Sequence, residues 1–457
     1  MLPNTLIADL NGKIVIMLEA GQSDMPLMQY FLQYGIEVKV KNINYLSSGG
    51  VFGNFIYQHE IEQLPPNYFT DHHDVNEILI SGEGYASSPK EPDNASSVTT
   101  ELQLLLQYCK SKVVMVTGSF GKQTTTALIS EIMERSGFNV FRRERHKKTV
   151  LCSLEDDFDY LVMDVTLDEV QHNEISSAAL VITNLSPYPF NPNIKFIDLV
   201  NRIVAHLNSN RHQMLVLNDD NYFCKIIDKK TTLTPCCFSY KRSDRSYVTF
   251  LNGKLSLGNE AIIDNSKEGE SFSMYGNRNL ECYLAAVAAV SLLYPDVNNQ
   301  IIKESVLNFK GADGHMEFVG FRRGRKYFNN LYSTSPAQTV AALTTLKENV
   351  ILITGGIEKN INFKALAMEI VYFCKVLILV GKASTEIKRA VESYHHYHKD
   401  HLPIFKVANV TKAVQLANHL STKGDMVLLS YSSHDSGNKY PFLDQRSEFV
   451  AAISSLV

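Results

Sequence analysis

The chain has no hydrophobic run of the length that a membrane span requires. No segment approaches the roughly 18 consecutive apolar residues of a transmembrane helix. The opening stretch, MLPNTLIADLNGK, also lacks the apolar core of a secretory signal peptide. The sequence therefore predicts a cytoplasmic protein without a membrane-spanning segment.

Other features that would mark a special class of protein are scarce or unpatterned. Tryptophan is absent, and the seven cysteines contain no CxxC spacing. An odd number of cysteines without such a framework argues against a disulfide-stabilised secreted fold and favours a reducing compartment. The net charge is only −4, so the chain lacks the one-signed field that attracts nucleic acid or an anionic membrane. We therefore expect no nucleic-acid partner.

Length and composition indicate a globular chain with more than one core. The 457 residues exceed what one typical core accommodates, and 45% of them are hydrophobic. Strand, loop and helix patterns alternate along the sequence, as in parallel α/β sheets. They fall into three blocks, so the predicted domains are residues 1–110, 111–311 and 312–457. The main predicted strands are 14–18, 160–164, 214–218, 349–353 and 376–380, and the main predicted helices are 25–34, 279–293 and 442–457.

The most informative stretch begins with the β-branched run 113–117. It leads into Gly118-Ser-Phe-Gly-Lys122, and a helical pattern follows from Thr124 to Glu134. Small residues let backbone N–H groups close on an anion, the helix dipole adds positive potential, and the lysine supplies a formal charge. The pattern predicts a site for the phosphates of a nucleoside triphosphate; the alternative is a glycine turn before an ordinary helix.

The loop departs from the usual pattern at one position. A standard P-loop follows its lysine with Ser or Thr, whose hydroxyl ligates Mg²⁺. Here Gln123 follows Lys122, and Thr124 comes one residue later. A glutamine carbonyl can also ligate Mg²⁺, but from a longer and more flexible side chain.

Five motifs in order resemble those of the Mur ligase family, the ATP-dependent, ADP-forming amide ligases of peptidoglycan synthesis. The resemblance covers nearly the whole chain, and the short N-terminal βαβ unit points to the members that add D-glutamate. The motifs are VTGSFGKQTTT at 116–126, GNRN at 276–279, GADGHME at 311–317, LITGGIEK at 352–359 and VLLS at 427–430.

This resemblance implies both an architecture and a reaction. The architecture is α/β with three domains: a Rossmann-like N-terminal domain, a central P-loop ATPase domain and a Rossmann-like C-terminal domain. In the reaction, a substrate carboxylate attacks the γ-phosphate of ATP to form an acyl phosphate, and the amine of an amino acid then displaces phosphate. The implied cofactors are ATP and Mg²⁺. The implied substrates are a UDP-muramoyl-peptide-like carboxylate and D-glutamate or another amino acid, and we expect a monomer.

The resemblance also assigns residues to roles. Lys122 and Asp164 are the expected catalytic residues, and Asp164 and Gln123 are the expected Mg²⁺ ligands. The expected ATP-binding residues are Gly118, Ser119, Phe120, Gly121, Lys122, Gln123, Thr124, Thr125, Asn279 and Asn330. The expected substrate-binding residues are Ser23, Arg145, Lys359, Ser430 and Phe442.

The departures from the family pattern cluster at the metal site. Pro189 stands where the family has a histidine ligand, and the family's carbamoylated lysine falls at Ala205 or His206. Two alternatives follow. Either the chain is a divergent family member with weak or no ligase activity or a non-muramoyl substrate, or the metal site is rebuilt from other residues. The candidates for rebuilding are Gln123, Asp164, Asp168, Glu169 and His206.

A basic run follows the P-loop helix at residues 141–148, FRRERHKK. In the ligases that add D-glutamate, the corresponding stretch is glycine-rich and lies near the substrate phosphates. The run could therefore bind an anionic substrate, with Arg145 as the candidate residue. The alternative is a solvated run on the surface.

Overall fold

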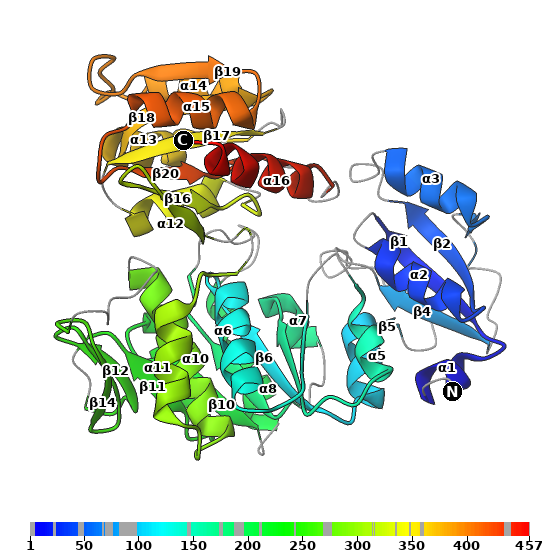
Figure 1. Ribbon diagram of the computed structural model, residues 1–457. Helices are drawn as coiled ribbons and strands as arrows, with labels where there is room; N and C mark the ends of the chain where they lie inside the picture. Colours follow the sequence, from blue (N-terminus) through cyan, green and yellow to red (C-terminus); the bar gives the residue numbers. More distant parts are fainter. Residues whose placement is uncertain are drawn as a thin grey trace.

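The computed structural model contains three bodies, each built around its own sheet (Figure 1). Each body combines parallel strands with helices, as the alternating sequence pattern predicted. The boundaries at 110/111 and 311/312 stay a prediction. The structure describes residues 5–21, 24–43, 50–65, 68, 76–81, 98–143, 148–172, 177–186, 196–209, 213–241, 244–267, 277–312, 314, 316–333, 336–346, 349–356, 361–433 and 440–456.

The first sheet is parallel and has the strand order β3-β2-β1-β4-β5. Its central strand β1 is apolar, and it confirms the strand predicted at 14–18. The last helix of this body, α5, begins with a capping box in which Thr100 and Gln103 bond each other's backbone N–H groups. The elements are β1 (Ile14–Ala20), β2 (Glu37–Ile43), β3 (Glu62–Gln63), β4 (Glu77–Ser81) and β5 (Thr99–Thr100), with α1 (Thr5–Leu10), α2 (Met25–Gln33), α3 (Gly50–Gln58) and α5 (Glu101–Tyr108).

The second sheet has nine strands in the order β14-β13-β12-β11-β10-β9-β6-β8-β7. The strands from β7 to β12 pair in parallel, and β12, β13 and β14 form an antiparallel extension. The strands are β6 (Lys112–Thr117), β7 (Val140–Arg142), β8 (Tyr160–Asp164), β9 (Ala179–Ile182), β10 (Met214–Asn218), β11 (Cys236–Ser239), β12 (Val248–Leu251), β13 (Lys254–Leu257) and β14 (Glu260–Asp264).

Helices cover both faces of the second sheet. On one face α10 packs against α6, and its small alanine side chains allow this close approach; residues 282–291 are all buried. The opposite face is covered by α8, whose buried residues recur at helical spacing, and by α9. The elements are α6 (Lys122–Arg135), the 3₁₀ helix η3 (Val150–Leu154), α7 (Leu167–His172), α8 (Phe196–Ser209), α9 (Tyr222–Lys230), α10 (Asn277–Leu293) and α11 (Asn299–Asn308).

The third sheet has the order β15-β16-β20-β17-β18-β19 and is parallel except for β15. The chain reaches β20 last, yet β20 lies between β16 and β17, so the winding direction changes beside β17. The elements are β15 (Glu317–Arg322), β16 (Arg325–Asn329), β17 (Val350–Gly356), β18 (Cys374–Gly381), β19 (Ile404–Val407) and β20 (Met426–Leu429), with α12 (Pro336–Leu346), α13 (Lys364–Phe373), α14 (Ser384–Glu392), α15 (Val410–Leu420) and α16 (Tyr440–Ser454).

The buried apolar side chains show how the three bodies are joined. One continuous cluster runs from the first sheet through α5 and η3 to a face of the second sheet. The other face of the second sheet has a separate cluster with α6, α10 and α11. The third sheet has its own clusters on its two faces. The first and second bodies therefore share a core.

Within the part of the chain that the structure describes, none of the helices combines the length and apolar character needed to cross a bilayer.

Candidate functional site

The glycine loop predicted from the sequence lies at the carboxyl end of β6, between β8 and β9. The loop covers residues 118–121, and α6 begins directly after it at Lys122. Gly118 has a φ of +141° and Gly121 a φ of +81°, and both values favour glycine. A Cβ at Gly118 would lie 2.2 Å from Thr183 Oγ1. The loop thus follows a path that glycine adopts without strain and other residues do not.

Asn184, just beyond β9, holds this loop in place. Its backbone carbonyl accepts a hydrogen bond from the Ser119 N–H at 2.9 Å, and its Oδ1 accepts one from the Phe120 N–H at 3.0 Å. Its Nδ2 donates to the Phe120 carbonyl at 3.2 Å and to Glu281 Oε2 at 3.1 Å. Because these two loop amides point at Asn184, phosphate binding would fall to the first N–H groups of α6, which a helix leaves without helical acceptors.

The first residues of α6 differ in how they face the loop. Lys122 turns back over it, and its Nζ donates to the Gly118 carbonyl at 2.8 Å. Thr124 and Thr125 are buried, and Thr125 Oγ1 has no hydrogen-bond partner within the described residues. Lys122 and Gln123 are partly exposed. The two side chains that can reach a nucleotide from this turn without rearrangement are therefore those of Lys122 and Gln123.

The oxygen donors near the loop suit Mg²⁺. Asp164 is the last residue of β8 and pairs in register with Val116 of β6, so it lies beside the strand end from which the loop starts. Asp164 is buried, and Gln123 lies in the first turn of α6. Magnesium prefers oxygen ligands and is often held by one or two carboxylates together with substrate phosphates. This donor set fits a Mg²⁺ ion that binds with the nucleotide.

The further ligands suggested by the sequence are placed differently. Among the described residues, no group of three His, Cys, Asp or Glu side chains could hold a metal ion. The two carboxylate oxygens of Glu169 accept bonds from Arg143 and from a backbone N–H. His206 lies near the end of α8, where burial lowers its pKa. The side chain of Asp168 is outside the described residues.

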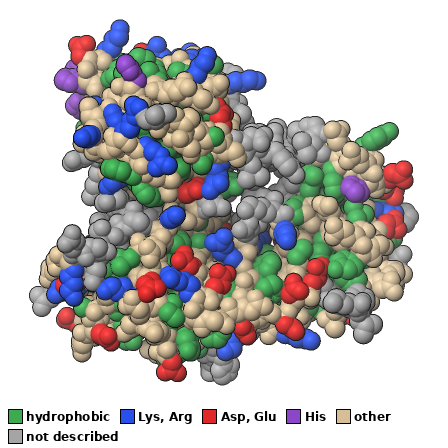
Figure 2. Space-filling model, viewed as in Figure 1, with side chains coloured by type: hydrophobic (Ala, Val, Ile, Leu, Met, Phe, Trp, Pro, Cys, Tyr) green, Lys and Arg blue, Asp and Glu red, His purple; other side chains and the backbone are tan. Residues whose placement is uncertain are grey.

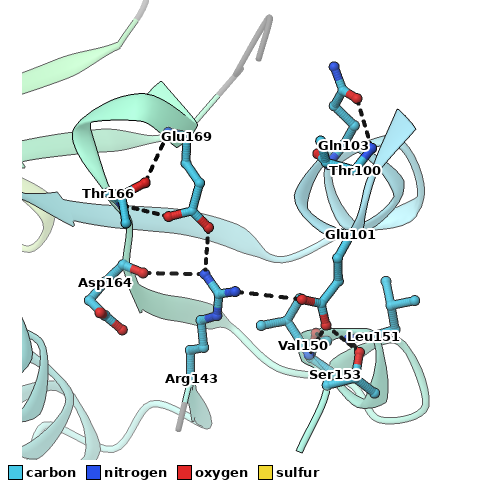
Figure 3. A network of polar contacts seen from close by, with 11 residues as sticks. Thr100, Glu101, Gln103, Arg143, Val150, Leu151, Ser153, Asp164, Thr166 and Glu169 are labelled. Carbon is cyan, nitrogen blue, oxygen red and sulfur yellow. Dashed lines mark hydrogen bonds and ion pairs between the residues drawn. The ribbon is translucent and has the colours of Figure 1, made fainter. Parts of the chain in front are cut away.

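The fold divides the basic run at 142–148. Only 7% of the Arg143 side chain is exposed, and it forms ion pairs with Glu101 at 3.5 Å and Glu169 at 3.2 Å (Figure 3). Arg142 instead lines a cavity of about 470 Å³ between α6 and the end of α11. Arg143 is therefore neither part of a solvated surface nor available to a substrate anion, and both sequence-based alternatives are wrong for this residue.

Asn330 and Ser430 meet at the carboxyl edge of the third sheet. Asn330 Nδ2 donates to Ser430 Oγ at 3.0 Å, and its Oδ1 accepts from the Met316 N–H at 3.1 Å. Ser430 follows β20, beside the point where the winding of the sheet changes and where α/β sheets commonly bind ligands. The two residues belong to a buried polar group that also contains the hydroxyls of Ser333, Thr339, Thr354 and Ser432.

Five predicted site residues lie wholly or partly outside the described residues. Ser23, Arg145 and Lys359 lie outside the described residues. The backbones of Asn279 and Phe442 lie in α10 and α16, but their side chains are outside the description.

Two residues that shape the site were not among the predicted site residues. Asn184 is found directly after a buried strand, and polar residues at that place often face a ligand site. Glu101 carries no comparable signal, because an acidic residue in the first turn of a helix is common for electrostatic reasons. Its pairing with Arg143 depends on how the first two bodies pack.

On the face shown in Figure 2, Lys and Arg side chains are interspersed with Asp and Glu side chains.

The chain is similar along nearly its whole length to named ligases, although no protein-family model matches it. The UDP-N-acetylmuramoylalanine–D-glutamate ligase of Ruminiclostridium cellulolyticum is 26% identical over 441 residues, which cover 93% of each chain. The ligase of the same name from Clostridium tetani is 28% identical over an alignment of 470 positions, which covers 97% of each chain.

Solved structures share the fold. UDP-N-acetylmuramate-alanine ligase MurC from Thermotoga maritima has a TM-score of 0.58 at 15% identity, covering 97% of this chain and 99% of that chain. MurF from Acinetobacter baumannii has a TM-score of 0.55 at 15% identity, with 87% and 88% covered. The predicted three-domain architecture is confirmed. The chain has the fold of the Mur ligases, and its sequence is similar along nearly its whole length to those of UDP-N-acetylmuramoylalanine–D-glutamate ligases.

Proposed function

We propose that the chain is an ATP-dependent, ADP-forming ligase that joins D-glutamate to a UDP-linked muramoyl-alanine carboxylate in peptidoglycan synthesis. The observation that carries this proposal is the glycine loop on β6, with Lys122 above it and Asp164 at the end of the adjacent strand. The names and full-length similarity of the relatives support the choice of substrates. We place the reaction in the cytoplasm, where ATP is available, and expect a monomer.

Each residue has a distinct task in this proposal. The first N–H groups of α6 and the Lys122 ammonium bind the β- and γ-phosphates and offset the charge that builds up on the transferring oxygens. Asp164 and Gln123 would hold Mg²⁺, which, when bound, supplies further positive charge at those oxygens. Positioning and electrostatics account for most of the catalysis, because the substrate carboxylate itself is the nucleophile.

The third domain supplies the amino-acid site in this proposal. Support comes from the buried polar group around Ser430, which lies at the carboxyl edge of the third sheet. Hydroxyl and amide groups recognise the carboxylates of an amino acid by hydrogen bonds. We also assign Ser23, Arg145, Lys359 and Phe442 to substrate binding, on the resemblance of their motifs.

The first test measures ATP binding by calorimetry with and without Mg²⁺. Phosphate release is then followed after adding UDP-N-acetylmuramoylalanine and D-glutamate. We expect Mg²⁺-dependent binding and a release that requires both substrates. Binding without release would reject ligation of this pair and favour a non-muramoyl substrate or an inactive family member. Failure to bind ATP would reject the nucleotide site.

A lysine variant tests the loop directly. Lys122→Ala removes a charge that offsets the developing phosphate charge, and loss of one such donor costs about 2.7–4 kcal/mol, a factor of about 10² to 10³ in turnover. The matched control is Lys112→Ala at the opposite end of β6, where the side chain lies 5.5 Å from the Tyr160 ring centre. Unchanged turnover in Lys122→Ala would reject the assignment.

A further inference from the structure

The guanidinium of Arg143 lies at a meeting point of three segments (Figure 3). Its Nη2 is 3.5 Å from Glu101 Oε2, and its Nη1 is 3.2 Å from Glu169 Oε1. Nη1 also donates to the backbone carbonyl of Asp164 at 3.4 Å. Only 7% of the side chain is exposed, so these contacts replace water as the guanidinium's surroundings. A buried arginine is retained at such a place only when several acceptors satisfy it.

The carboxylate on the α5 side of Arg143 is itself fixed. Glu101 Oε1 accepts hydrogen bonds from the Val150 N–H at 3.0 Å and from the Thr149 hydroxyl. Glu101 is the first residue of α5 and directly follows β5, the edge strand of the first sheet. One arm of the guanidinium is therefore anchored to the junction between the first and second bodies.

The carboxylate on the other side is fixed equally well. Glu169 Oε2 accepts from the Thr166 N–H at 2.5 Å, and the Glu169 N–H donates to Thr166 Oγ1 at 3.0 Å. This reciprocal pair is the capping box that starts α7, directly after β8. The second arm of the guanidinium is therefore anchored to the turn that follows Asp164.

Arg143 contacts the backbone carbonyl of Asp164, and the Asp164 carboxylate points in another direction. Figure 3 shows the Asp164 side chain pointing away from the guanidinium while its carbonyl faces it. A cation bonded to that carboxylate would compete with a metal ion for the same oxygens, whereas a cation bonded to the carbonyl constrains only the backbone. The contact constrains the backbone at Asp164 and does not place the guanidinium on its carboxylate.

We propose that Arg143 is a positioning residue for Asp164, acting on Mg²⁺ binding through the strand end and turn that it holds. The inference rests on the proposed function only in its assignment of Asp164 to Mg²⁺. It separates Arg143 from Arg145, which we assign to an anionic substrate. Groups that orient metal ligands typically change metal affinity by about 10- to 100-fold when they are altered.

The test measures how ATP binding depends on Mg²⁺ concentration, by calorimetry with ATP. Arg143→Lys keeps the charge but loses the planar fork that reaches three acceptors at once. We expect the Mg²⁺ concentration for half-maximal binding to rise about 10-fold, with ATP binding in EDTA unchanged. Glu169→Gln should shift it in the same direction by less, because the contacts of Arg143 to Glu101 and Asp164 remain.

Arg245→Lys is the control, because Arg245 also pairs with a carboxylate of the second body, Asp228 at 2.7 Å. It should leave the Mg²⁺ dependence unchanged. An Arg143→Lys variant that melts earlier but keeps the wild-type Mg²⁺ dependence would reduce Arg143 to a structural role and overturn the proposal. If Arg143→Lys does not fold, a wild-type Mg²⁺ dependence in Glu169→Gln would overturn it.

The binding assay separates this proposal from the ligase proposal. Wild-type protein that binds ATP with Mg²⁺ but releases no phosphate would reject ligation and leave the role of Arg143 testable. Wild-type binding that is independent of Mg²⁺ would overturn the role of Arg143 itself.

Discussion

Replacing Gly118 by alanine is expected to damage both the fold and the nucleotide site. The φ of +141° is one that an L residue rarely adopts, and a Cβ there would lie 2.2 Å from Thr183 Oγ1 and 2.8 Å from the Asn184 carbonyl oxygen. The Asn184 carbonyl cannot rotate aside, because it also accepts the Ser119 N–H. The added methyl group must therefore displace the loop or the segment after β9.

Two costs combine in this variant. A left-handed backbone costs an L residue about 1–2 kcal/mol, and forcing a methyl group into a packed site costs about 1–3 kcal/mol more. We therefore expect Gly118→Ala to lower the free energy of unfolding by about 2–5 kcal/mol. Displacement of the loop should also weaken ATP binding, because the first backbone N–H groups of α6 would no longer point at the phosphates.

Gly137→Ala isolates the first cost, that of a left-handed backbone. Gly137 has a φ of +95° at the end of α6, but nothing lies within 4 Å of a Cβ built there. This control should therefore lose only about 1–2 kcal/mol and bind ATP normally. Urea unfolding gives both free energies, and calorimetry gives both affinities. Equal destabilisation of the two variants would refute the claim that the loop is packed against Asn184.

Two further predictions follow from titratable groups. Burial raises the pKa of Glu317, but hydrogen bonds led by Arg446 lower it by more, so its pKa lies below the ordinary value. Because its pKa is lowered, the contribution of Glu317 to stability is present at neutral pH and is lost as the pH falls below about 4.5. Glu317→Gln should therefore flatten the acid side of a curve of unfolding free energy against pH. An unchanged acid side would contradict this prediction. Burial raises the pKa of Cys236 to about 12 and of Cys237 to about 11. Thiol reagents at pH 7 should therefore label these two cysteines only after unfolding. Fast labelling of the native chain would contradict this prediction.

Local sequence signals predicted the elements well where hydrophobic periodicity was strong. The strand expected at 214–218 is β10, and the helix expected at 25–34 is α2. Differences are confined to element ends: α6 begins at Lys122, two residues before the predicted start, because the loop turns directly into the helix. Ends depend on capping and tertiary contacts, which periodicity does not encode.

The parts of the site that could not be predicted depend on distant partners. Arg143 stands in a basic run, and its sequence neighbours suggest a solvated or anion-binding surface. Its burial depends on Glu169, 26 positions later, and on Glu101. Asn184 is 64 positions from Phe120. Such pairs form only when parallel strands bring their carboxyl ends together. A single sequence predicts the strands, but it does not predict which side chains meet at their ends.

The core shared by the first two bodies determines which parts of the molecule can turn against each other. Side chains from α5 and η3 fill the space between the first sheet and one face of the second, and Arg143 is buried close to that junction. Rotation there would have to expose apolar surface and separate a buried guanidinium from its carboxylates. The third body is packed around cores of its own. The shared core therefore resists rotation between the first two bodies, whereas a rotation of the third body would leave that core intact.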